Sequence, residues 1–414
     1  MEPLGTINWK QNLVCTWIGQ ILCMAGYAAI MPFIPLFIRD RFHITNEKEL
    51  GMWVSALTFF GFLSYVFSTP IWGILADKFG RKLMLLRSYY VSFVLFPLLY
   101  FAPSVIGLIA IRFFISCFSG SVTAAQTLIV TTTPKEHQGV ALGLLSTAVW
   151  SGNMIGLLAG SFFVDQFGYF WGFMGCGAMY LVGGVVTHIF VKEHFVPPDK
   201  KAAKVPFRDK VRGLPAAVWV VLVLFVAMSI ARQLDTPYVS LFVRAIGSPE
   251  KAIRNTGFIS LVAAAGGLLS GIIMGRLCDK YSPTAVAIPA VLLSALTTLV
   301  QAFSFNLWML GGARFALYLT AGGLDPAFQS LLAKLSPPEQ QGTLLGVAAS
   351  LRMVGVLLAS ALGGGIIWIF ESIRAVFIGA VVVFLLLLPL IFLAARDIKS
   401  TNQRKGRMLW ATKS

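Results

Sequence analysis

Charged residues are scarce in this sequence of 414 residues: 12% of its residues are Asp, Glu, Lys or Arg, whereas 57% are hydrophobic. Soluble domains carry about a quarter charged residues, so a soluble globular protein is excluded. Histidine (four residues) and cysteine (five residues) are also scarce. Neither type occurs at the spacing of metal ligands, so no metal site is expected, and the scattered cysteines are typical of small buried residues. With a mean hydropathy of +0.79, the composition predicts an integral membrane protein.

Motifs of enzymes are missing as well. The sequence has no glycine-rich phosphate-binding loop and no arrangement of serine, cysteine or histidine typical of nucleophilic catalysis. ATP hydrolysis and an enzymatic function are therefore not expected, and no cofactor is implied. A cleavable signal peptide is not expected either, because the polar start MEPLGTINWKQN leads into an apolar run that is too long for one.

Long apolar runs are what the chain has in abundance. Many reach about twenty residues, the length that crosses a bilayer as a helix, and none alternates like a barrel strand. They lie near residues 13–38, 51–75, 84–101, 104–131, 140–163, 170–191, 216–243, 256–277, 284–304, 306–333, 343–369 and 374–395. The sequence therefore predicts an all-α integral membrane protein with twelve transmembrane helices in a lipid bilayer.

Basic residues gather in alternate connections between these runs. The chain has 33 Lys and Arg against 17 Asp and Glu, a net charge of +16. Such a charge could indicate a nucleic acid partner, but its placement follows the positive-inside rule, so no nucleic acid is expected. The basic connections, among them 192–215 and the tail 396–414, fall on one side of a twelve-span topology, which places both termini in the cytoplasm.

An internal repeat divides the chain into two halves. The landmarks 202 positions apart are Gly73, Asp77 and Lys78 with Gly275, Asp279 and Lys280, and Arg112 and Gly120 with Arg314 and Gly322. The predicted parts are an N-terminal six-helix bundle (1–191), a cytoplasmic linker (192–215), a C-terminal six-helix bundle (216–395) and a basic cytoplasmic tail (396–414). Two pseudo-symmetric bundles are typical of a transporter with its site between the halves.

Three segments resemble signatures of the major facilitator superfamily. GILADKFGRK (73–82) is similar to its loop between helices 2 and 3, and IRFFISCFSG (111–120) to its helix 4 motif. AIMPFIPLF (29–37) resembles the Pro-x-x-Pro of helix 1 in drug exporters, and INWKQNLVCTWIG and YVSLFVRAIG resemble segments of the twelve-helix drug:proton antiporter branch. The resemblance covers essentially the whole chain. It implies a monomeric transporter of the bacterial cytoplasmic (inner) membrane that exchanges cargo for protons by alternating access.

The helix 5 motif of the antiporters is eroded. Where that family has roughly Gly-x-x-x-Gly-Pro-x-x-Gly-Gly, this chain keeps Gly152, Gly156 and Gly160. Leu157 stands in place of the proline, and Ser161 in place of the last glycine. Because this motif is associated with exporters, the sequence leaves the direction of transport open.

The charged loop of the first signature has two interpretations. In the resembling family it latches the two halves together, which assigns Gly73, Asp77, Gly80 and Arg81, with Asp279 from the second copy, to a gating latch. The alternative is a positive-inside turn without a moving part. We favour the latch, because Gly and Asp stand at the family's spacing, and we expect Asp77 to pair with Arg81 or to cap a following helix.

Four arginines lie deep in the apolar runs, where an unpaired cation is costly. The resemblance assigns Arg112 to proton relay and to coupling with cargo. Its repeat counterpart, Arg314, could face the interior or extend to the surface. Arg352 lies near the middle of its run, and Arg232 precedes Asp235 by three residues, a spacing that puts both on one helix face.

Two acids, Asp235 and Asp325, share this depth. A carboxyl group in a poorly solvated cavity can exchange protons near neutral pH, so both are candidate proton carriers. Arg112 joins them in proton coupling only through the resemblance. The alternative for Asp235 is a local ion pair with Arg232. The chemistry of these positions therefore suggests protons as a partner of transport.

The surplus of arginine over acid favours an anionic cargo, because a guanidinium group pairs with a carboxylate or phosphate. The glutamine and tyrosine candidates have alternative roles in helix packing. The predicted substrate-binding residues are Arg232, Arg352, Gln126, Gln329, Tyr238 and Tyr27.

Three functions therefore stay open at the level of sequence. The first is proton-coupled efflux of drugs or metabolites, which the resemblance favours. The second is import or export of a specific anionic solute, such as a polycarboxylate or a siderophore, which the arginine surplus favours. The third is a membrane sensor without transport, which should lose the loop signature and the helix 4 arginine that this chain keeps.

Overall fold

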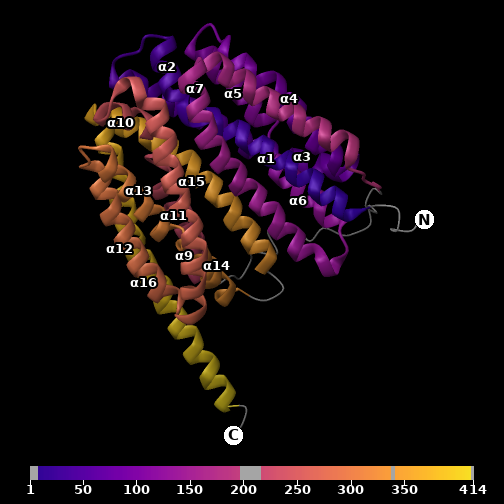
Figure 1. Cartoon of the computed structure of the whole chain (residues 1–414). Helices are drawn as coiled ribbons and strands as arrows, with labels where there is room; N and C mark the ends of the chain where they lie inside the picture. The colour runs from indigo at the N-terminus through magenta and orange to yellow at the C-terminus, as the bar shows by residue number, and fades with distance from the viewer. Residues whose placement is uncertain (1–7, 196–215, 337–340, 412–414) are drawn as a thin grey trace. The chain divides into compact units, whose positions relative to one another are not determined.

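The computed structural model describes residues 8–195, 216–336 and 341–411, and the regular elements among them are all helices (Figure 1). The first half contains α1 (Trp9–Ile30), η2 (Met31–Phe33), α2 (Ile34–Arg41), α3 (Glu47–Phe79), α4 (Arg81–Tyr100), α5 (Val105–Cys117), α6 (Ser121–Thr132), η3 (Lys135–His137) and α7 (Gln138–Phe190). The second half contains α9 (Ala216–Gln233), η4 (Thr236–Tyr238), α10 (Val239–Ile246), η5 (Pro249–Lys251), α11 (Ala252–Lys280), α12 (Pro283–Ala302), α13 (Leu307–Ala321), α14 (Leu324–Leu335), α15 (Gln341–Phe370) and α16 (Ile373–Ala411).

Ten helical segments of the described chain are long and apolar enough to cross a bilayer. The longest, Lys135–Phe190, holds two helices joined at Gly168, where φ is +83°. When its two arms are counted separately and α13–α14 is added, the twelve predicted spans are accounted for. The prediction of an all-helical, multi-span membrane protein is therefore confirmed.

Equivalent helices of the two halves break in the same way. The short 3₁₀ turn η2 interrupts the first span, and η4 interrupts the seventh. Each turn contains a proline, Pro32 or Pro237, and proline removes a backbone donor from the helix. The fourth span breaks between α5 and α6, and the tenth between α13 and α14. The repeated breaks support the duplication that the sequence indicates.

Side chains at the helix starts explain where several spans begin. Ser104 caps α5 by accepting from the amide of Gly107 at 3.1 Å. Asn306, 202 positions later, caps α13 by accepting from the amide of Met309 at 2.8 Å. Each cap satisfies a backbone donor that the helix itself leaves free, so both halves set this boundary with a local polar residue.

The contacts of the chain form two compact units. Unit 1 is Met1–Lys201 with Pro237–Leu261, and unit 2 is Ala202–Thr236 with Val262–Ser414. Residues 237–261 thus pack within unit 1 although they follow the predicted linker, of which residues 196–215 lie outside the described part. The predicted domain boundaries remain a prediction.

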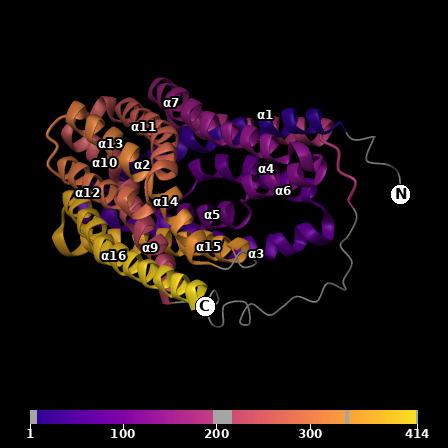
Figure 2. The same cartoon turned by 90° about the horizontal axis from the view of Figure 1, so that it is seen from below.

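Within unit 1, α1 packs closely against α7 (Figure 2). Gly152, Gly156 and Gly160 of α7 face the backbone of α1, and a Cβ on Gly152 would lie 2.6 Å from the carbonyl oxygen of Ile21. Small residues let helices in a bilayer approach this closely. The glycines that remain of the helix 5 motif therefore serve as a packing face in this chain.

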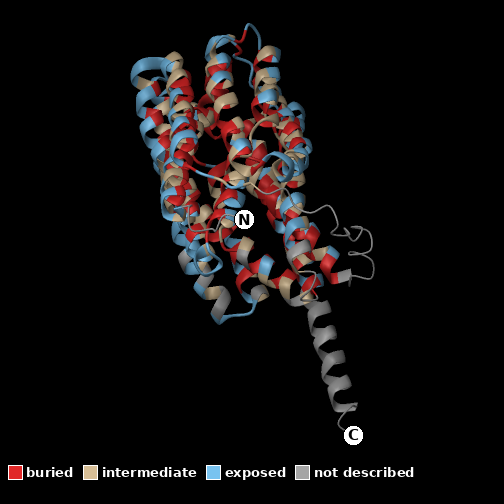
Figure 3. Cartoon of the chain, turned by 90° about the vertical axis from the view of Figure 1, so that its right-hand side faces the viewer, coloured by how far each residue is buried: buried red, intermediate tan, exposed pale blue. Residues whose placement is uncertain are grey.

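Burial separates two faces on most helices (Figure 3). Inner positions are apolar and nearly inaccessible, such as Phe225 and Phe328 in unit 2. Large apolar side chains such as Phe67 (69% exposed) and Trp308 (83%) lie on the outside. Lipid is the natural partner for such groups, because an extended apolar surface is unfavourable in water.

Candidate functional site

The signature loop joins α3 to α4 and contains one loose ion pair. Arg81 Nη2 lies 3.6 Å from Asp77 Oδ1, and the Asp77 side chain is 61% exposed. The predicted pairing of these two residues is present. No described atom lies within 4 Å of a Cβ built on Gly73, and the side chain of Asp279 lies outside the described part of the chain. The gating latch therefore stays a prediction.

A distant carboxylate holds the start of α4, and the sequence interpretation missed it. Both oxygens of Glu193 accept backbone hydrogen bonds, from Arg81 N at 3.0 Å and from Lys82 N at 2.7 Å. Gly80 has φ +95° and lies against this carboxylate: a Cβ there would be 3.1 Å from Glu193 Oε2. Glu193 thus does what a local capping side chain does elsewhere. The sequence feature that could have revealed this role is the position of Glu193 shortly after the sixth span.

Asp235 and Arg314 form a buried ion pair in unit 2. Arg314 Nη1 donates to Asp235 Oδ2 at 2.6 Å and to Gln301 Oε1 at 3.1 Å, and the two charged side chains, Arg314 and Asp235, are 4% and 2% exposed. Arg314 therefore faces the interior, one of its two predicted orientations. The expectation that Arg232 and Asp235 share a helix face is wrong, because α9 ends at Gln233 and the chain turns before η4.

Asp325 lies between two arginines, also in unit 2. Its Oδ2 accepts from Arg232 Nη1 at 2.7 Å and its Oδ1 from Arg352 Nη1 at 2.8 Å. The side chains of Arg232, Asp325 and Arg352 come from α9, α14 and α15 and are 31%, 26% and 29% exposed. We call these three residues the charge cluster. The structure thus brings together three of the predicted site residues.

The charge cluster carries one net positive charge, because two guanidinium groups face one carboxylate. Asp325 uses one nitrogen of each arginine, so further N–H groups of both can bind an anion. Arg352 also lies over the ring of Phe225, 5.5 Å from its centroid, which holds the guanidinium plane in place. A carboxylate bound to these N–H groups would compete with Asp325 and rearrange the ion pairs.

Arg112 of α5 has a different environment in unit 1. Its Nη2 donates to the hydroxyl of Tyr27 at 3.3 Å, and no ion pair joins it to a carboxylate among the described residues. Gly61 of α3 makes room for it, since a Cβ there would lie 3.4 Å from Arg112 Nε. The structure therefore brings Tyr27 and Arg112 together at a partly exposed cation.

Two further residues that the sequence interpretation missed hold the break in the fourth span. Trp72 Nε1 donates to the carbonyl of Cys117 at 2.6 Å, and Arg87 Nη2 to that of Ser119 at 3.0 Å. Both carbonyls lie where α5 ends and no longer have helical partners. The guanidinium of Arg87 stacks on Trp72, 3.5 Å from the ring centroid. The sequence feature that could have revealed this contact is a Trp and an Arg on two consecutive helices.

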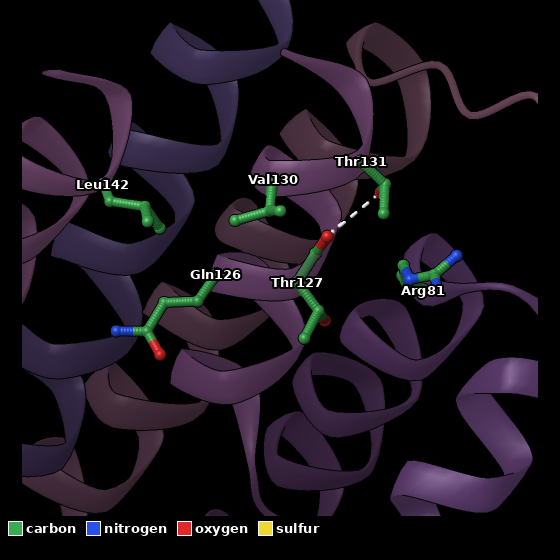
Figure 4. Close-up of a pocket in the computed structure, with 6 residues that line it drawn as sticks. All are labelled: Arg81, Gln126, Thr127, Val130, Thr131 and Leu142. Atoms are coloured by element: carbon green, nitrogen blue, oxygen red, sulfur yellow. Dashed lines mark hydrogen bonds between the residues drawn. The ribbon is translucent and has the colours of Figure 1, made fainter. Parts of the chain in front are cut away.

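A pocket of about 470 Å³ opens in unit 1 beside α6 (Figure 4). It is lined by Arg81, Gln126, Thr127, Val130, Thr131 and Leu142. Of the predicted substrate-binding residues it contains Gln126. Gln329 is exposed on α14 in unit 2, whereas Tyr238 is fully buried and hydrogen bonded to Ser55, so its hydroxyl has no surface open to a cargo here.

Comparison with known proteins identifies the scaffold. The family model of the Major Facilitator Superfamily matches residues 16–271 and 252–413. The multidrug resistance protein MdtG of Salmonella schwarzengrund (strain CVM19633) is 32% identical over 363 residues, which cover 87% of this chain and 89% of that protein.

Solved structures agree on the fold. The crystal structure of the nucleoside transporter NupG superposes with a TM-score of 0.76 at 10% identity, covering 94% of this chain and 99% of that one. A bacterial homologue of the human lysosomal transporter Spinster, in an inward-facing and unoccupied conformation, gives a TM-score of 0.73 at 16% identity, covering 97% and 98%.

Three findings indicate a transporter. They are the duplicated six-helix halves with buried charges, the family match across nearly the whole chain, and the MdtG relative. A sensor without transport and an enzyme are both set aside by this match. The chain belongs to the major facilitator superfamily and is a multi-pass membrane protein that works as a secondary transporter of small molecules.

Proposed function

We propose that this transporter exports drugs or related metabolites in exchange for protons, across the bacterial cytoplasmic membrane, as a monomer with both termini inside. The observation that carries efflux is the identity of 32% over 87% of the chain to a multidrug resistance protein. The basic connections between spans support the orientation. The eroded helix 5 motif does not oppose it, because its remaining glycines still pack α7 on α1.

The charge cluster is where we place the coupling between protons and cargo. Asp325 carries ion pairs to Arg232 and Arg352 at the same time. A proton on Asp325 would remove both pairs at once and free two guanidinium groups to move. A transporter that alternates needs such an element with two arrangements, biased by what it binds. Asp235 is the weaker candidate proton carrier, because it is buried in an ion pair with Arg314.

Flux into proteoliposomes tests the proposal. Vesicles with an acidic interior are supplied with labelled tetraphenylphosphonium, and the membrane potential is clamped with potassium and valinomycin. An antiporter takes up the cation as protons leave, and nigericin abolishes the uptake. Asp325→Asn should remove the gradient dependence, while Glu250→Gln, which changes an exposed acid in η5, should not. Uptake that ignores the proton gradient would contradict antiport.

A specific anionic cargo, such as a polycarboxylate or a siderophore, is the second candidate. It is favoured by the net positive charge of the charge cluster and by Arg112, which has a tyrosine hydroxyl as its partner. Labelled citrate in the same vesicles tests it. Under this proposal Arg232→Ala and Arg352→Ala each reduce citrate flux by about tenfold or more, the scale of one lost charge-assisted contact. Unchanged citrate flux in both variants would rule out this site.

A further inference from the structure

The pocket beside α6 combines a cation, polar groups and apolar walls. Arg81 and Leu142 mark opposite sides of it, with Thr127 and Val130 between them (Figure 4). A volume of about 470 Å³ is within the range of pockets that hold small organic ligands. All of its lining comes from α4, α6 and α7 of unit 1.

The polar side chains of this pocket keep hydrogen-bonding capacity that the described fold does not use. The hydroxyls of Thr127 and Thr131 donate to carbonyls of their own helix, which leaves their oxygen lone pairs available as acceptors. Gln126 is exposed, and no hydrogen bond of its amide is found among the described residues. Gln138 holds the end of α6, since its Nε2 donates to Val130 O at 2.8 Å, so the wall itself is fixed.

The side chain of Arg81 is held weakly, although its backbone is held firmly. The backbone amide is bound by Glu193 at 3.0 Å, whereas the guanidinium has Asp77 as its ion-pair partner at 3.6 Å, beyond hydrogen-bond distance. Asp77 is 61% exposed, and such pairs contribute little. Both carboxylate oxygens of Glu193 are occupied by backbone amides, so this acid does not compete for the guanidinium.

We propose that this pocket is a binding subsite for amphiphilic organic anions, in which the anionic group binds Arg81 and the apolar part lies along Val130 and Leu142. The ligand takes the guanidinium from Asp77. Occupancy of the pocket therefore opens the Asp77–Arg81 pair in the signature loop, which links cargo binding to that loop. This proposal names the substrate class of one subsite, and it rests on the proposed transport function.

Binding of an anion and its neutral isostere tests the subsite. The purified full-length protein in nanodiscs of zwitterionic lipid is titrated with naphthalene-2-sulfonate and with naphthalene-2-sulfonamide, and the fluorescence of empty nanodiscs is subtracted. Arg81→Gln should weaken sulfonate binding by about tenfold and change sulfonamide binding by less than about twofold, because only the anion forms a charge-assisted contact. Asp77→Asn should tighten sulfonate binding, because it removes the competing carboxylate.

Lys78→Gln is the matched control, since it removes an exposed cation of the same loop that does not line the pocket. If it weakens sulfonate binding as much as Arg81→Gln does, surface charge explains the binding and the subsite is wrong. Equal losses for both ligands in Arg81→Gln would also overturn it. Because no gradient is used, failure here leaves the flux experiments on Asp325 unaffected, and failed antiport leaves this binding result standing.

Discussion

Arg112 and Arg314 occupy equivalent positions of the two halves but have opposite environments. Arg314 is enclosed with Asp235 and Gln301. Arg112 is partly exposed and donates to the hydroxyl of Tyr27. The duplication therefore preserved the helix and the arginine, while the partner diverged. The charge of Arg314 is neutralised by a buried carboxylate, whereas no ion pair neutralises Arg112 among the described residues.

The starts of α4 and α12 show a second divergence at one repeat position. In the first half Gly80 cannot cap the helix with a side chain, and Glu193, three residues after the end of α7, supplies the acceptor. In the second half Ser282 caps α12 itself, accepting from Ala285 N at 3.3 Å. Ser282 stands 202 positions after Gly80, so the second half has a local cap where the first half has a distant one.

The largest effect that would sharpen the arginine comparison is expected for Asp235→Asn. It leaves Arg314 buried without its carboxylate, which costs about 3–5 kcal/mol of unfolding free energy. Tyr27→Phe removes one neutral hydrogen bond from Arg112 and should cost about 1 kcal/mol. Denaturant unfolding of the purified protein in micelles compares them. The double variant Asp235→Asn/Arg314→Gln should recover part of the loss, and equal losses for Asp235→Asn and Tyr27→Phe would break the comparison.

The glycines at the breaks of the fourth and tenth spans give the next largest expected effects on unfolding free energy. Gly322→Ala is expected to cost about 1–3 kcal/mol by overpacking, because the added Cβ would collide with the buried side chain of Ser270. Gly120→Ala should cost about 1–2 kcal/mol for another reason: φ is +112°, and the added Cβ has open space. Adding Ser270→Gly should rescue part of the loss in Gly322→Ala in the same unfolding measurement, because the carbonyl oxygen of Tyr318 stays 2.9 Å from the added Cβ. Failure of that rescue would contradict the packing explanation.

Removal of the two caps is expected to have a smaller effect. Ser282→Ala loses a local cap, which costs about 1 kcal/mol. Glu193→Ala loses two backbone hydrogen bonds at α4 and should cost somewhat more, about 1–2 kcal/mol. Glu193→Gln keeps one acceptor oxygen and should lie between Glu193→Ala and the unmodified protein. If Glu193→Ala is as stable as the unmodified protein, the distant cap has no role.

Asp77→Asn is expected to change stability least. The pair with Arg81 is exposed and 3.6 Å long, so its loss should cost less than about 0.5 kcal/mol. The thermal unfolding midpoint should therefore stay within error of the unmodified protein, and transport rates should carry any effect. A large loss of stability would show that this ion pair stabilises the fold and would contradict a movable latch.

Much of the fold followed from sequence patterns, and the candidate site followed only in part. The positions of Arg232, Asp325 and Arg352 were each suspected from their depth in apolar runs, yet nothing in the sequence says that they meet. The suspected neighbours Arg232 and Asp235 are separated by the end of α9 at Gln233. Glu193, Trp72 and Arg87 escaped notice because their partners are backbone groups far away along the chain.

The sequence by itself determined the number of spans, the duplication and the family. A bilayer forces the chain into helices of a given length, and a repeat shows in residue order. Tertiary structure alone decided which charges are paired. Asp325 meets two arginines and Asp235 meets Arg314 because breaks at η4 and before α14 redirect the helices. Such pairing depends on distances between helices, which residue order does not record.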